Sequence, residues 1–206
     1  MSEAKVWDRL AKSYDRSVRL FDRSYPRVRE LLHADLADRE QVLEVAAGTG
    51  QFTFDLAETV GNLKATDVSP RMVQRLAGKV AERGSGNVET EVMSAYRLDV
   101  EDGSLDAIFS ANALHVMQTP ERALREFHRA LRPSGRLVIP TFLHAANWRA
   151  RLLSWLLGVV SPFVAHTKFT ATSLKQMVAD AGFAVREPIV LPGKFPLAYL
   201  VADRVA

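Results

Sequence analysis

Residues 42–50 read Val-Leu-Glu-Val-Ala-Ala-Gly-Thr-Gly, an apolar run with one acid, Glu44, that ends in a turn of small residues. Residues 51–57 then place apolar side chains three and four positions apart, which predicts the start of a helix. A strand that turns sharply into a helix leaves unpaired backbone N–H groups at the turn, in front of the positive end of the helix dipole. Gly48 and Gly50 let a ligand approach the main chain, because no Cβ stands in the way. The stretch therefore indicates a nucleotide-type binding loop.

Composition limits the classes of protein that need to be considered. A chain of 206 residues suits one domain, and 48% hydrophobic with 25% charged residues is typical of a soluble globular protein. The net charge of +3 is spread over interleaved charges of both signs, so no nucleic-acid partner is expected. There is no cysteine, which excludes disulfides and thiolate metal sites and fits a cytoplasmic protein. The histidines are too scattered to indicate a metal site.

The most apolar run of the chain covers residues 152–165, within a variable segment at 142–170. It is shorter than the roughly 20 residues that span a bilayer, and the N-terminus lacks a hydrophobic signal segment, so no transmembrane helix is expected. Two readings of the run remain open. It is a lid or pocket helix for a hydrophobic substrate, or residues 148–165 make a peripheral membrane contact, which Arg149 and Arg151 beside the run would favour.

Strands and helices alternate through the middle of the chain. Residues 1–38 are expected to form an amphipathic helical cap. Strands are predicted near 41–45, 63–67, 88–93, 105–110 and 136–141, with helices that start at Ser69-Pro70 and Thr119-Pro120, where Ser or Thr is the N-cap and Pro is N1. A tight turn is expected at 132–135. This alternation predicts a mostly parallel sheet with helices on both faces.

The C-terminal part departs from this alternation. A helix is predicted from Thr172 to Ala181 with Gly182 as its C′ residue, followed by strands near 184–190 and 196–203. Their connection is too short for a parallel return, so they should form an antiparallel hairpin. The fold class expected is one α/β domain over residues 1–206, a Rossmann-like, doubly wound sheet of seven strands.

In such a sheet the ligand binds at the carboxyl ends of the strands, beside the first strand. Asp67 ends the second strand about twenty residues after the loop, where a carboxylate accepts both hydroxyls of a ribose. The candidate cofactor-binding residues at these strand ends are Glu44, Ala46, Gly48, Gly50, Asp67, Val68, Met72, Ser94, Ala95 and Ser110.

Two kinds of nucleotide compete for the loop. A dinucleotide fold uses G-x-G-x-x-G to seat a diphosphate, and here Ala46 and Gln51 occupy the first and last glycine positions. An S-adenosylmethionine site has no diphosphate to hold, and it needs only the loop and an acid after the second strand. The residues favour the second ligand.

Four blocks of the sequence, together with the N-terminal segment, resemble the class I S-adenosylmethionine-dependent methyltransferases of the small-molecule type. Residues 42–50 resemble the family's acidic-x-G-x-G-x-G motif, and residues 65–72 (Ala-Thr-Asp-Val-Ser-Pro-Arg-Met) resemble its second motif. Residues 104–109 and 131–137 match two further blocks in order, and Trp7 to Asp15 looks like the family's W-x-x-x-A-x-x-Y-D segment. The similarity covers about residues 5–141.

The resemblance implies S-adenosylmethionine as cofactor, S-adenosylhomocysteine as product, and in-line transfer of a methyl group to an N, O or C atom of a small, hydrophobic acceptor. A protein that binds S-adenosylmethionine without transfer is the main alternative, and a nicotinamide-dependent oxidoreductase is a weaker one. The acceptor itself is not indicated, although the lack of cysteine argues against thiol-dependent arsenic methylation.

The sequence departs from the family at two positions. Ala46 replaces the first loop glycine, which is expected to be tolerated if this residue does not adopt a positive φ. Ser94 stands where relatives commonly have an acid that binds the adenine amino group, and a serine accepts a hydrogen bond without charge.

Two residues are candidates for a catalytic role. His115 follows the fourth strand beside the expected methyl position and is either a general base or a packing residue. Tyr14 lies on the N-terminal helical cap and either covers the methionine moiety or packs in the core. His144 and His166 flank the variable segment and are further candidates for substrate contact.

Overall fold

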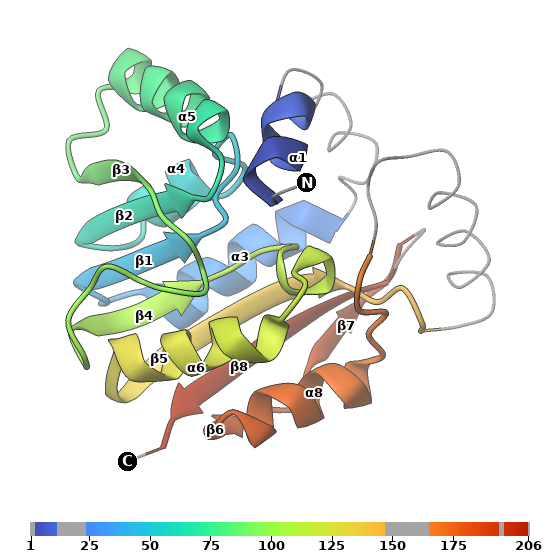
Figure 1. The fold of residues 1–206 in the computed structure, drawn as a ribbon. Coiled ribbons are helices and arrows are strands. Elements are labelled where there is room, and N and C mark those ends of the chain that lie inside the picture. The colour runs from blue at the N-terminus through green and yellow to red at the C-terminus, as the bar shows by residue number, and fades with distance from the viewer. Residues whose placement is uncertain (1–2, 12–23, 147–164, 194–195, 206) are drawn as a thin grey trace.

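The computed structural model describes residues 3–11, 24–146, 165–193 and 196–205 (Figure 1). Its strands form one eight-stranded sheet in the order β3-β2-β1-β4-β5-β8-β6, with β7 also paired to β8. The strands are β1 (Gln41–Val45), β2 (Asn62–Asp67), β3 (Val88–Val92), β4 (Leu105–Phe109), β5 (Leu131–Phe142), β6 (Phe183–Val185), β7 (Ile189–Leu191) and β8 (Leu197–Arg204). The α-helices are α1 (Glu3–Leu10), α3 (Tyr25–Leu36), α4 (Thr53–Ala57), α5 (Pro70–Arg83), α6 (Pro120–Ala130) and α8 (Ala171–Asp180).

The chain adds strands first on one side of β1 and then on the other, so the strand order switches at β1. This strand pairs in parallel with β2 on one side and with β4 on the other. The connections that follow β1 and β4 therefore lead away from each other, which opens a crevice at the carboxyl ends of the two strands. The predicted α/β class and doubly wound, mostly parallel sheet are confirmed.

The number of strands differs from the expected seven. The single strand predicted near 184–190 is two short strands, β6 and β7, and both pair antiparallel with β8. Pro188 lies between them, and proline has no N–H to donate to the ladder, so pairing is interrupted there. The antiparallel C-terminal arrangement itself is as predicted.

Helices cover both faces of the sheet. Along β1, Leu43 and Val45 belong to the core that α6 and α8 cover, whereas Val42 lies in the core beneath α3 and α4. Figure 1 shows α6 and α8 on the near side of the sheet and α3 on the far side. Because the central strands are buried on both faces, they are continuous apolar runs and not alternating ones.

The turn predicted at residues 132–135 is part of a strand. β5 begins at Leu131, which pairs with Leu105, and the register between β4 and β5 shifts before Ala107. Ser134 has φ of +61° at this irregularity. The extra residues of β5 therefore interrupt the regular pairing with β4, and a Pro-Ser-Gly sequence does not distinguish such an irregularity within a strand from a turn.

The helix starts were only partly predicted. The Ser69 hydroxyl caps α5 by accepting from Met72 N–H, as expected. Thr119 is the N-cap residue of α6 and Pro120 opens the helix, as expected, but the Thr119 side chain makes no capping hydrogen bond. Thr170 forms a capping box with Ser173 at α8, which the sequence analysis did not include.

The N-terminal cap and the variable segment are described in part. α1 and α3 confirm helical structure in residues 3–10 and 25–36. Residues 147–164, which include most of the apolar run, lie outside the described residues. Among the helices that are described, none combines the length and the apolar character needed to cross a membrane.

Candidate functional site

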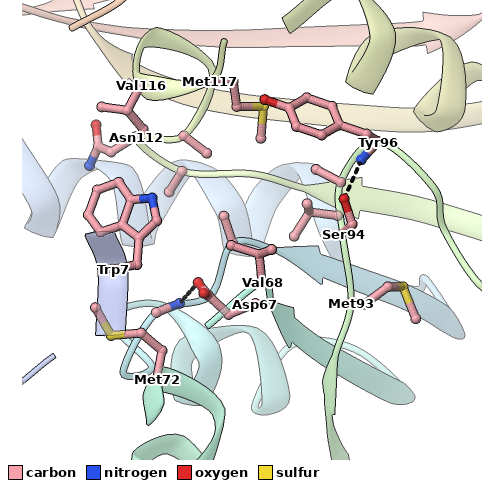
Figure 2. A pocket seen from close by; sticks show the side chains of 16 residues that line it. Trp7, Asp67, Val68, Met72, Met93, Ser94, Tyr96, Asn112, Val116 and Met117 are labelled. Carbon is pink, nitrogen blue, oxygen red and sulfur yellow. Dashed lines mark hydrogen bonds between the residues drawn. The ribbon is translucent and has the colours of Figure 1, made fainter. Parts of the chain in front are cut away.

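A pocket opens at the carboxyl ends of β1, β2, β3 and β4, where the sheet topology predicts one (Figure 2). The loop after β1, the start of α5, the chain after β3, the chain after β4 and one residue of α1 all contribute to its wall. The lining residues are Trp7, Val45, Ala46, Gly48, Asp67, Val68, Met72, Met93, Ser94, Ala95, Tyr96, Ala111, Asn112, Ala113, Val116 and Met117. Seven of the ten predicted cofactor-binding residues are among them; Glu44, Gly50 and Ser110 are not.

The loop after β1 is bent by a run of left-handed residues. Ala46, Gly48 and Gly50 have φ of +58°, +58° and +90°. The condition under which alanine would be tolerated at position 46, a residue that does not adopt a positive φ, is therefore not met. An alanine in this region costs about 1 kcal/mol or more relative to glycine, because its Cβ approaches the following carbonyl oxygen. The family's glycine at this position relieves a strain that this chain retains.

Backbone donors in the loop already have partners within the protein. Ala47 N–H donates to the Thr66 carbonyl at 2.9 Å, and Gly50 N–H donates to the Ala47 carbonyl at 3.0 Å. Gly48 N–H donates to the Asp67 carboxylate at 3.0 Å. The expectation of unpaired N–H groups is wrong for these three residues. A diphosphate cradle needs such groups free, so the loop geometry disfavours a dinucleotide.

Asp67 is anchored by both of its carboxylate oxygens. Oδ2 accepts from Gly48 N–H at 3.0 Å, and Oδ1 accepts from Ser69 N–H at 2.9 Å. The side chain is 7% exposed, and burial raises its pKa to about 6, although the two backbone hydrogen bonds oppose this rise. A carboxylate offers about four lone-pair sites, so about two remain for hydroxyl donors of a ligand in the pocket.

Glu44 lies beneath the loop and not in the pocket wall. It is 3% exposed, and its Oε2 is 2.5 Å from the hydroxyl of Thr53, which begins α4. Burial raises the pKa of Glu44 to about 8, and the hydrogen bond from Thr53 only partly opposes it. The side chain is therefore mostly protonated at neutral pH, and it ties the strand to the helix that follows the loop.

The chain after β3 supplies one wall of the pocket. Ser94 and Ala95 line it together with Met93 and Tyr96. The Ser94 hydroxyl accepts from Tyr96 N–H at 3.3 Å, so its oxygen also shapes the local turn. Ser110 follows β4 but is fully buried behind the wall, and its hydroxyl has no hydrogen-bond partner among the described residues.

His115 does not line the pocket. It is 7% exposed, its Nδ1 is 3.0 Å from the Thr141 hydroxyl, and its ring packs against His144 at a centroid distance of 4.9 Å. Burial, with a smaller contribution from His144, lowers the pKa of His115 to about 3. The ring is neutral at physiological pH and is a weak base. Of the two readings left open by the sequence, this geometry supports packing.

Several pocket residues were not predicted from the sequence, and one predicted residue lies outside the described range. Tyr14, the other catalytic candidate, lies among residues that the structure does not describe. Trp7 was placed only in the N-terminal segment that resembles the family, yet it reaches the pocket from α1 (Figure 2). Asn112, which has φ of +53°, also lines the pocket, and its Nδ2 donates to the Tyr25 hydroxyl at 3.2 Å. The position of Asn112 just after the fourth strand was the feature of the sequence that could have predicted its place in the pocket.

The charge of the pocket suits a cationic nucleoside. Asp67 is the single charged side chain among the described lining residues, and none of those residues is a cation. Methionine and valine side chains supply apolar contacts on the walls, at Val68, Met72, Met93 and Met117. An S-adenosylmethionine carries a sulfonium, an apolar adenine face and a ribose, and these residues fit it better than they fit a diphosphate. No group of His, Cys, Asp and Glu in the described part of the chain could hold a metal ion.

Comparison with known proteins agrees with this geometry. A family model described as a methyltransferase domain matches residues 43–139. The demethylmenaquinone methyltransferase of Tropheryma whipplei (strain Twist) is 30% identical over 164 residues, which cover 78% of this chain and 67% of the relative. The ubiquinone/menaquinone biosynthesis C-methyltransferase UbiE of Hahella chejuensis is 30% identical over 151 residues, and the match spans 70% of this chain and 61% of that relative.

The fold is also shared with solved structures. A SAM-dependent methyltransferase from Aquifex aeolicus superimposes with a TM-score of 0.72 at 23% identity, covering 93% of this chain and 98% of that one. The sequence similarity argues against the oxidoreductase alternative, which rested on a glycine pattern that the loop does not contain. The chain belongs to the class I S-adenosylmethionine-dependent methyltransferase family.

Proposed function

We propose that this protein transfers a methyl group from S-adenosylmethionine to a small apolar acceptor of the quinone-ring type. The observation that carries the proposal is the doubly anchored Asp67 at the carboxyl ends of β1 and β2, in a pocket whose described lining residues include no cation. The names of the two relatives support a quinone-type acceptor. A cytoplasmic location, expected from the lack of cysteine, is part of the same proposal.

The cofactor half of the site is assigned as follows. S-adenosylmethionine supplies a methyl group on a positively charged sulfur, which is already an activated leaving group. Asp67 would accept the ribose hydroxyls, and Val68 and Met93 would pack against the nucleoside. Ser94 and Ala95 would lie at the adenine, with an uncharged hydroxyl where relatives have an acid.

Among the described residues, the acceptor half is mainly apolar, and Asn112 adds a polar side chain. Trp7, Val116 and Met117 contribute apolar surface to the pocket. The Oδ1 atom of Asn112 is buried and has no hydrogen-bond partner among the described residues, so it is offered to a donor on the bound ligands. A hydroxyl or amino group bound there would satisfy this oxygen, whose burial without a partner costs about 1 to 3 kcal/mol.

Positioning of the acceptor accounts for most of the rate enhancement in this proposal. In-line attack forms the bond from acceptor to methyl while the sulfur–methyl bond breaks, and the electron pair stays on sulfur. An acceptor that carries a proton releases it to solvent or to a base. His115 is not assigned as that base, because its pKa is about 3 and it lies outside the pocket wall.

Calorimetry with S-adenosylmethionine, S-adenosylhomocysteine and NAD tests the cofactor assignment. We expect binding of the first two, and about tenfold or greater weakening in Asp67→Asn, which removes one acceptor oxygen and its charge. The exposed Asp99 provides a matched control, since Asp99→Asn makes the same chemical change away from the pocket. No binding by the unsubstituted protein, or equal affinity in the Asp67 and Asp99 variants, would refute the assignment.

Acidification supplies a second test of Asp67. The free protein binds a proton on this carboxyl below about pH 6, and the hydroxyl contacts favour the charged form. Affinity for S-adenosylhomocysteine should therefore fall by up to about tenfold per pH unit below about pH 6, and binding there should release up to one proton from Asp67. An affinity that is flat between about pH 5 and about pH 7 would contradict this role.

Turnover separates an enzyme from a protein that only binds the cofactor. Formation of S-adenosylhomocysteine in the presence of demethylated quinones, phenols and amines, compared with a reaction without acceptor, identifies the acceptor class. Methyl transfer to a demethylated quinone would support the quinone reading. Cofactor binding with no turnover on any acceptor class would favour the alternative of a binding protein.

A further inference from the structure

Helix α1 reaches the cofactor pocket through Trp7 and is held to the body of the protein by the next residue, Asp8. Asp8 Oδ1 accepts a hydrogen bond from the Ser69 hydroxyl at 2.6 Å and from Arg71 N–H at 3.2 Å. Both partners belong to the start of α5, against which α1 packs (Figure 1). The sequence segment that resembles the family includes Trp7 but leaves the position of Asp8 unspecified.

Asp8 completes the N-terminal cap of α5 from a different helix. The first residue of α5 is Pro70, which has no N–H, and the third, Met72, donates to the Ser69 hydroxyl at 3.1 Å. Arg71 N–H is the remaining donor of the three, and Asp8 accepts it. A carboxylate at this end of a helix is also stabilised by the helix dipole. The hydrogen bond from Ser69 lowers the pKa of Asp8; desolvation opposes this effect, and the hydrogen bond from Arg71 N–H adds to it.

The same residues connect α1 to the acid that we assign to the ribose. Ser69 N–H donates to Asp67 Oδ1 at 2.9 Å while its hydroxyl donates to Asp8, so Ser69 lies between the two carboxylates. Ser69 is fully buried and therefore adopts a defined position. Figure 2 shows Trp7 at the edge of the pocket with Asp67 and Met72 near one side of its ring. One hydrogen-bonded series thus runs from α1 to two lining residues of the pocket.

We propose that Asp8 is a positioning residue that fixes α1 on the start of α5 and thereby holds Trp7 against the bound S-adenosylmethionine. The inference rests on the proposed function, because it assigns the cofactor to this pocket. Asp8 does not line the pocket, so its effect on the cofactor is exerted through Trp7 and Ser69. If α1 leaves its position in most molecules, the apparent affinity falls in proportion to the fraction that remains in place.

Trp7 provides a spectroscopic readout of this position. The chain has three tryptophans, and the other two are Trp148 and Trp155. In a Trp148→Phe, Trp155→Phe background, the emission of Trp7 reports whether its indole is held in the pocket or exposed to water. We expect Asp8→Asn to shift this emission to longer wavelength in the free protein and to raise the Kd for S-adenosylhomocysteine by about tenfold.

Three companion variants make the test specific. Arg9→Gln changes an exposed residue of the same helix and should leave emission unchanged and Kd within about twofold. Asp8→Glu keeps the carboxylate and should restore the Kd to within about threefold. In a Ser69→Ala background, where the hydroxyl donor is already absent, Asp8→Asn should have a clearly smaller effect than in the unsubstituted protein.

The outcomes distinguish this inference from the function on which it rests. Unchanged Trp7 emission and Kd in Asp8→Asn, or equal effects of Asp8→Asn and Arg9→Gln, would overturn the role of Asp8 while leaving the methyltransferase proposal in place. If the unsubstituted protein does not bind S-adenosylhomocysteine, the proposed function fails. In that case, the Trp7 emission of the ligand-free proteins would still show whether Asp8 holds α1 in place. The proposed role of the contact in binding the cofactor would be refuted.

Discussion

Replacing Glu44 by glutamine should make the protein more resistant to unfolding at high pH. Glu44 is 3% exposed beneath the loop, and its pKa is raised from 4.5 to about 8, mainly by burial. The folded protein therefore carries a neutral carboxyl at pH values where the unfolded chain has released its proton. Glutamine resembles the protonated acid in shape and still offers an oxygen to the Thr53 hydroxyl, which lies 2.5 Å from Glu44 Oε2.

The size of the effect follows from the two pKa values. Between pH 4.5 and about 8 the folded state binds one more proton at Glu44 than the unfolded state, so stability falls as the pH rises. Each pKa unit is worth about 1.4 kcal/mol, which gives a cost of about 5 kcal/mol above the folded pKa. About 2 kcal/mol of this cost develops between about pH 6 and about pH 8, and the glutamine variant does not incur it.

Urea unfolding of both proteins at about pH 6, 7, 8 and 9 measures this difference. At about pH 6 the glutamine variant should already have the higher free energy of unfolding by about 2 kcal/mol, and this difference should grow by about 2 kcal/mol more by about pH 8. Infrared difference spectra of the two folded proteins should show the carbonyl stretch of a protonated acid only in the unsubstituted one. Parallel pH profiles for the two proteins would show that Glu44 is ionised in the folded state and would refute the reasoning.

Three further perturbations test the loop and the buried histidine. Ala46→Gly should raise the free energy of unfolding by about 1 kcal/mol, since Ala46 has φ of +58°. The control Ala77→Gly, within helix α5, should lower the free energy of unfolding by about as much. Urea denaturation measures both changes, and destabilisation by both substitutions would contradict the strain at Ala46. Gly50→Ala should lower the melting temperature and reduce the free energy of unfolding by about 2 to 4 kcal/mol. The added Cβ would lie 2.5 Å from Leu76 Cδ1, and residue 50 has a φ of +90°. An unchanged melting temperature would show that the loop adapts to the substitution. The His115 ring, with a pKa of about 3, should show no NMR titration above about pH 4. As the pH falls below 6.5, the unfolded chain binds a proton at His115 that the folded protein does not bind, so the free energy of unfolding should fall. An NMR titration midpoint near pH 6.5 would return His115 to the candidates for a general base.

Much of the site was predictable because it depends on local sequence. Gly48 follows one strand with a distinct apolar run and Asp67 ends another, and parallel strands bring their carboxyl ends to one edge of the sheet. The placement of Asp67 about twenty residues after the loop therefore predicted its presence in the pocket. The start of α5 was equally predictable, since Ser69-Pro70 combines a side-chain cap with a residue that needs no N–H partner.

Other predictions failed because they concern contacts between distant segments. The sequence does not show that Asp67 accepts Gly48 N–H, which converts an apparent anion-binding turn into one whose donors are occupied. Nor does it show that His115 lies behind the pocket wall against His144, where burial removes its basicity.

The sequence by itself determined the class of fold and the edge of the sheet at which the ligand binds, because hydrophobic periodicity and turn residues act over a few positions. The tertiary structure alone decided the charge and the donors of that site. Burial of Glu44 and Asp67 sets their pKa values, and α1 brings Trp7 and Asp8 to the start of α5 across about sixty positions of sequence. Solvation and long-range contact depend on the packed chain, and no local pattern records them.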